Sequence, residues 1–151
     1  MKKLRIGDIF EITTPVGKAY LHYIYENPSI GSLIRILQGL HQNTPDDIHN
    51  LVCSQEQFMI FFPLAAAYKK NIVQNVGFFP AERYTKPQFM RTEHNLKGIS
   101  LGWHIVNTDS WHRQLVENLT PELKKLSPWG IWNDTLLIEN LNSSWSLEKW
   151  G

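Results

Sequence analysis

Two segments near the start of the chain alternate in side-chain character with a period of two, which is typical of β-strands. They are residues 8–13 (DIFEIT) and 19–25 (AYLHYIY). Pro15 and Gly17 lie between them, where a turn needs first a fixed and then a permissive backbone angle. In the second segment both faces are largely apolar or amphipathic, as in a central strand or a barrel wall. The two segments are therefore predicted to form an antiparallel pair in a strongly curved sheet.

More strand signals follow along the chain, separated by turn-forming residues. Gly77, Pro80 and Pro87 indicate an extended loop that leads into a strand, and the sequence NTD between two apolar segments is typical of a hairpin loop. Near the C-terminus, Asn133 and Asp134 are interpreted as a turn. The further predicted strands are residues 33–37, 58–62, 88–92, 100–106, 110–116 and one or two within 129–141.

Proline residues mark the starts of the predicted helices. Thr44 and Pro45 have the residue types of an N-cap and a first helical position, which predicts a short helix to about Cys53. Pro63 ends a strand and begins a second helix over residues 64–73. By the same reasoning, short helical segments are predicted after Thr120 and Pro121 and, in the tail, after Ser144 or Ser146.

Short strands with two or three short helices predict an α+β fold, with a curved antiparallel sheet or a small barrel. The chain of 151 residues is long enough to bury one core, so we predict a single domain over residues 1–151. The formal net charge of +1 does not favour nucleic-acid binding, which normally needs a strong basic excess. A single cysteine and the lack of a long apolar run predict a cytoplasmic protein with no membrane partner.

Motifs for catalysis and metal binding are missing from the sequence. It contains no Gly-x-Ser-x-Gly and no glycine-rich loop before a helix. His49 and Cys53 are spaced to share a helix face, but two ligands do not complete a metal site, and Cys53 is interpreted as a buried, unreactive residue. We therefore predict no enzyme activity, no catalytic residue, no metal and no cofactor. Two Trp-His pairs, at 103–104 and 111–112, are predicted to lie on adjacent strands and to serve packing, with ligand binding as the alternative.

Three sequence pieces resemble a known family when they are taken in order. They are IGDIFEITTPVGKAYLHYIY, then FFPLAAAYKKNIVQNVG, then PQFMR followed by GWHIVNTD. Over roughly residues 5–115 the chain resembles the immunity protein 26 family, whose members are bacterial proteins encoded beside polymorphic toxins. The resemblance implies an immunity protein that binds and neutralises a cognate toxin by occluding its active site. It implies no catalytic residue.

Two other functions remain open from the sequence alone. The first is a small β-barrel that binds nucleic acid or nucleotides, with Tyr20, Tyr23, Tyr25 and the tryptophans as stacking platforms. The second is a small hydrolase that uses His22 or His104 as an acid or a base.

The C-terminal tail is the predicted contact surface for the toxin. Trp145 and Trp150 lie in a polar segment, NSSWSLEKWG, and protein interfaces are enriched in tryptophan at their centres. The nearby carboxylates of Glu139 and Glu148 could steer a basic partner. The alternative is that the tail folds back and both tryptophans cover the hydrophobic core.

Overall fold

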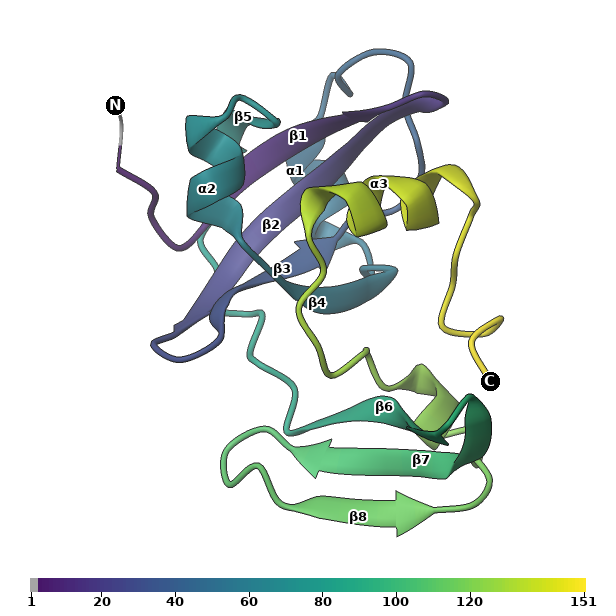
Figure 1. Cartoon of the computed structure of the whole chain (residues 1–151). Coiled ribbons are helices and arrows are strands. Elements are labelled where there is room, and N and C mark those ends of the chain that lie inside the picture. The colour runs from purple at the N-terminus through teal and green to yellow at the C-terminus, as the bar shows by residue number, and fades with distance from the viewer. Residues whose placement is uncertain (1–2) are drawn as a thin grey trace.

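The computed structural model describes residues 3–151 and shows an α+β fold built on two antiparallel sheets (Figure 1). The first sheet has five strands in the order β4-β3-β2-β1-β5, and the second has three in the order β6-β7-β8. Neither sheet closes into a barrel. Of the two predicted architectures, the antiparallel sheet is therefore confirmed. The strands are β1 (Asp8–Thr14), β2 (Gly17–Asn27), β3 (Gly31–Ile36), β4 (Phe58–Phe62), β5 (Val73–Phe78), β6 (Phe89–Leu96), β7 (Ile99–Asn107) and β8 (Arg113–Val116). The helices are α1 (Ile48–Cys53), α2 (Leu64–Lys69) and α3 (Asp134–Asn142), with a 3₁₀ turn at Leu123–Lys125.

The predicted opening hairpin is confirmed. Strands β1 and β2 pair antiparallel, from Ile9 opposite His22 to Thr14 opposite Gly17. Thr14 closes the turn, because its Oγ1 accepts the backbone N–H groups of Val16 and Gly17 at 3.2 and 3.1 Å. Since β3 pairs with the outer edge of β2 and β5 with the outer edge of β1, the hairpin forms the centre of the sheet.

The five-stranded sheet is buried on both faces, which agrees with the apolar character of both faces of β2. On one face, alternate strand residues such as Phe10, Leu21 and Ile34 form a core with α2 and α3. On the other face, Ile9 and Tyr20 pack with α1, and residues farther along pack with the second sheet. Figure 1 shows α2 and α3 in front of this sheet and α1 behind it.

One extended segment, residues 127–132, joins the two sheets. The backbone N–H of Arg91 in β6 donates to the Ser127 carbonyl, and the Trp129 N–H donates back to the Arg91 carbonyl. On the other side, the Met59 N–H of β4 donates to Ser127 Oγ at 2.9 Å, and Trp132 N–H donates to the Phe61 carbonyl. This segment therefore covers part of the free edge of β4, where unpaired backbone groups would otherwise be left.

The helix predicted from Pro45 is shorter than expected and begins at Ile48. Its N-cap is Asp47, whose Oδ1 accepts the Asn50 N–H at 3.1 Å. Thr44, the predicted cap, instead donates its hydroxyl to Glu11 on β1 at 3.0 Å. The side chain of Thr44 therefore forms a tertiary hydrogen bond instead of the predicted N-cap hydrogen bond.

The second helix ends at Lys69, four residues before the predicted end, because Asn71 adopts a left-handed backbone angle of +59°. The chain after it forms β5, a strand that the sequence analysis missed and interpreted as the helix end and a loop. Val73 of β5 is buried opposite Ile12 of β1. The strand is stabilised by a partner some sixty residues earlier in the chain, and no local signal reports that pairing.

The prediction of one or two closing strands within 129–141 is wrong, because most of this segment forms α3. Asn133 is an N-cap rather than a turn residue: its Oδ1 accepts the Leu136 N–H at 2.8 Å. Leu137 and Leu141, four residues apart, are both buried against the sheet. The spacing of these two leucines is that of one helix face. The short apolar run around them is compatible with a strand as well as with a helix, so the sequence alone did not decide between the two.

Two further elements differ in length from the predicted ones. After Thr120, only the 3₁₀ turn forms, although the Thr120 Oγ1 does accept the Leu123 N–H. Strand β6 continues to Leu96, and the turn after it consists of Lys97 and Gly98, both at positive φ. Within residues 3–151, none of the helices has both the length and the apolar character needed to span a bilayer.

Candidate functional site

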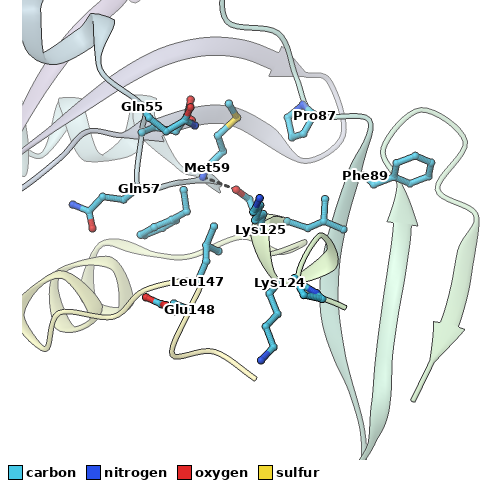
Figure 2. A pocket seen from close by; sticks show the side chains of 14 residues that line it. Gln55, Gln57, Met59, Pro87, Phe89, Lys124, Lys125, Leu147 and Glu148 are labelled. Carbon is cyan, nitrogen blue, oxygen red and sulfur yellow. Dashed lines mark hydrogen bonds between the residues drawn. The ribbon is translucent and has the colours of Figure 1, made fainter. Parts of the chain in front are cut away.

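A groove of about 730 Å³ lies where β4, the start of β6, the 3₁₀ turn and the C-terminal tail come together (Figure 2). Apolar side chains form much of its lining together with charged side chains of both signs, of which all but the partly buried Glu56 are exposed. This is the arrangement of a protein interface, with an apolar centre and a polar rim. The apolar lining includes Phe58, Met59, Phe89, Leu126 and Leu147, and the charged residues are Glu56, Lys124, Lys125 and Glu148.

The wall formed by the tail is held by Arg91 of β6, which is completely buried. Its guanidinium donates four hydrogen bonds to backbone carbonyls, those of Lys124, Leu126, Leu147 and Trp150, at 2.8 to 3.1 Å. The first two carbonyls belong to the 3₁₀ turn region and the last two to the tail. One side chain therefore ties both segments of this wall to the second sheet.

Arg91 is also enclosed by aromatic rings. Its guanidinium carbon lies 4.7 Å from the ring centre of Trp103 and 4.2 Å from that of Trp150. Burial lowers the pKa of Arg91 to about 10, so the group stays charged at neutral pH. A charge so deeply buried needs partners, and here carbonyl dipoles and ring faces provide them.

The opposite wall, residues 55–57, is held by a second buried arginine. Arg35 Nε donates to Glu56 at 2.9 Å, and Nη2 donates to the carbonyls of Val52 and Ser54, both at 3.0 Å. The guanidinium also stacks 3.8 Å from the ring centre of Tyr84. Because each wall is fixed by a buried guanidinium, the groove is formed before any partner binds.

His22 completes the network around Arg35. Arg35 Nη1 donates to His22 Nδ1 at 3.1 Å, so the proton of the neutral ring lies on Nε2, which donates to the Phe79 carbonyl at 2.8 Å. Burial, with a smaller contribution from the charge of Arg35, lowers the pKa of His22 to about 4, although the hydrogen bond to the Phe79 carbonyl acts in the opposite direction. His22 is thus a neutral structural residue with both nitrogens in use.

The structure separates the four predicted partner-binding residues into two groups. Trp145 packs edge-on against Phe58 and Trp132, with ring centres 4.8 and 5.0 Å apart, and Trp150 packs against Trp103 at 4.9 Å. The tail therefore folds back, and both tryptophans are half-buried in packing contacts. Glu139 and Glu148 are exposed, and of these Glu148 lines the groove while Glu139 does not.

Several other predicted candidates do not come together. The second Trp-His pair is not on a strand, because Trp111 and His112 lie in the β7-β8 loop, where Trp111 has a left-handed φ of +63°. His104 forms a hydrogen bond with His94, whereas His22 forms one with the Phe79 carbonyl, so the two histidines considered for catalysis do not meet. Tyr20 and Tyr23 are buried, so their rings do not offer the stacking surface considered for nucleic acid.

The interpretation of Cys53 as a buried residue is wrong, because it is exposed at the end of α1. His49 on the same helix packs its ring against Phe79, with centres 5.3 Å apart. In the described part of the chain, no cluster of three or more His, Cys, Asp or Glu side chains has a geometry suited to a metal ion. Neither residue contributes to the groove.

Sequence reasoning missed the groove and the two arginines that hold its walls. Arg35 stands inside a strand between two isoleucines, and Arg91 stands inside a strand after Met90; a charged residue at such a position is rarely buried without partners. The position of each arginine within a strand was the sequence signal for its burial. It does not indicate which carbonyls the side chain contacts.

Comparison of the chain with protein-family models, with curated proteins and with solved structures yields no match. The resemblance to the immunity protein 26 family therefore stays a prediction.

Proposed function

We propose that this chain is a protein-binding domain of the immunity type, which acts in the cytoplasm by binding a cognate toxin and occluding its active site. The observation that carries the proposal is the preformed groove between the two arginine-held walls. A loop of the toxin domain that presents an apolar side chain between polar neighbours would fit it. The resemblance of residues 5–115 to immunity proteins supplies the class of partner.

The groove provides the two features that interface energetics require. Phe89 is 41% exposed at the groove, so a large aromatic side chain is available to a partner without any rearrangement. Lys124, Lys125 and Glu148 are exposed beside it and can orient a partner of mixed charge. Because the walls are already ordered, binding would lose little conformational entropy.

The experiment uses the protein domain encoded beside the gene of this chain, which the proposal requires to be a toxin. We expect the two purified proteins to form a complex, and co-expression to protect cells from the toxin. Replacement Phe89→Ser should weaken the complex roughly tenfold or more, because it removes an exposed aromatic side chain from the groove. Titration calorimetry measures the affinity, and a growth assay measures protection.

The matched control is Ile99→Ser, which removes an apolar side chain that is even more exposed but lies outside the groove. This variant should bind and protect as the unchanged protein does. Two results would contradict the proposal: no complex between the purified proteins, or a loss of affinity in Ile99→Ser that equals or exceeds the loss in Phe89→Ser.

A further inference from the structure

A second cavity, of about 490 Å³, opens between the three-stranded sheet and the end of β4. It shares no lining residue with the groove, and its size is in the range of small-molecule sites. The two walls differ in chemistry. The sheet contributes His94, His104 and Arg113, and the opposite wall contributes the apolar residues Phe61, Trp129 and Ile131.

The two histidines on the polar wall form a pair. His104 Nε2 and His94 Nδ1 are 2.8 Å apart, so one ring donates a hydrogen bond to the other. The remaining ring nitrogen of His104, Nδ1, is buried and is the one such side-chain atom in residues 3–151 that has no hydrogen-bond partner. Buried polar atoms are nearly always paired, so the hydrogen-bonding capacity of His104 is incomplete in this structure.

The charges around the pair favour an anion. Arg113 on β8 is exposed and takes part in none of the ion pairs formed within the described chain. Burial, then His94 and Arg113, lower the pKa of His104, so an anionic group beside the pair would relieve the repulsion on its protonated form. Glu93 of β6 also lines the cavity and is the carboxylate that opposes this charge. The opposite wall contributes no charged side chain.

We propose that this cavity binds a small phosphate monoester that carries an aromatic ring, of the size of a nucleoside monophosphate. Arg113 and the histidine pair recognise the phosphate, because guanidinium and imidazole N–H groups are strong donors to phosphate oxygens. Trp129 and Ile131 contact the ring system. Trp129 already meets Phe61 edge-on at 6.0 Å, and the same kind of surface accepts a ligand ring. The site is independent of the proposed toxin interface.

Titration of the purified full chain with AMP, adenosine and inorganic phosphate tests the proposal. We expect AMP to bind at least tenfold more tightly than either of the other two, because only AMP engages both walls. Chemical-shift changes in the NMR spectrum should include residues 92–95 and 129–131. Failure of AMP to bind, or equal affinity for adenosine or for inorganic phosphate, would overturn the proposal.

Variants then locate the site. Arg113→Met should lower the affinity for AMP roughly tenfold, since it removes the one permanent positive charge on the polar wall. Arg83→Met makes the same chemical change at an exposed arginine outside the cavity and should leave the affinity unchanged. His104→Gln should also weaken binding, and thermal unfolding confirms that each variant is folded. Equal effects of Arg113→Met and Arg83→Met would rule the cavity out.

Discussion

Replacement of Arg91 with methionine is expected to lower the free energy of unfolding by about 3–5 kcal/mol, the range for loss of a buried, charged hydrogen-bonding group. Methionine fills part of the volume but donates no hydrogen bond. The change leaves four backbone carbonyls, two near the 3₁₀ turn and two in the tail, without the donor that the folded protein provides. It also removes the contact of the guanidinium with Trp103 and Trp150.

Denaturant unfolding of the purified variant measures this change. Near-ultraviolet circular dichroism follows the packing of Trp103 and Trp150, which should weaken together with the loss of stability. Arg91→Lys keeps the charge but has neither the planar fork nor its four-bond geometry, so it should fall between methionine and the unchanged protein. Arg83→Met, at an exposed arginine, should change the free energy of unfolding by less than about 0.5 kcal/mol. A similarly small effect of Arg91→Met would show that the arginine does not hold the tail.

Acid should destabilise the protein through His22. The folded protein holds this ring neutral with a pKa of about 4, whereas the ordinary value is 6.5, so the unfolded chain takes up a proton first as the pH falls. The contribution of His22 is therefore fully present above the unfolded pKa. It is lost as the pH falls from about 6.5 to about 4, and the total loss is roughly 3 kcal/mol.

The variant His22→Gln isolates this contribution from the carboxylates that titrate in the same range. Glutamine offers an acceptor and a donor for Arg35 and the Phe79 carbonyl but does not take up a proton in this pH range. Its stability should depend less steeply on pH between about 6.5 and 4, by up to one proton. His112→Gln, at an exposed histidine, should keep the slope of the unchanged protein. Equal slopes for the unchanged protein and His22→Gln would refute the assignment of acid sensitivity to His22.

The two arginines have a consequence for the proposed interface. Each holds one wall of the groove from within the protein, and neither lines it. A loss of toxin binding in Arg91→Met would therefore report a disordered wall, and only Phe89→Ser reports a direct contact. Substitutions of the predicted contact residues Trp145 and Trp150 would likewise disturb the wall, because both side chains pack in the tail.

Local signals in the sequence were sufficient for the central hairpin, for β4 and for the β7-β8 hairpin. In each, an alternating or β-branched segment lies beside residues that favour a turn, and both kinds of signal act over a few neighbouring residues. The buried character of both faces of β2 was also visible, because residues 19–25 are apolar or amphipathic at every position rather than at every second one.

Where local signals favour two secondary structures equally, only the tertiary structure decided between them. The apolar segment of α3 and its Asn-Asp start suit a strand with a turn as well as a capped helix, and contact of Leu137 and Leu141 with the sheet selects the helix. Strand β5 exists because β1 offers it a free edge. The groove joins residues near positions 57, 88, 125 and 147, and Arg91 finds its acceptors 33 to 59 residues away in the sequence. Such long-range pairings depend on the packed chain as a whole, whereas turns and periodicity depend on neighbours alone.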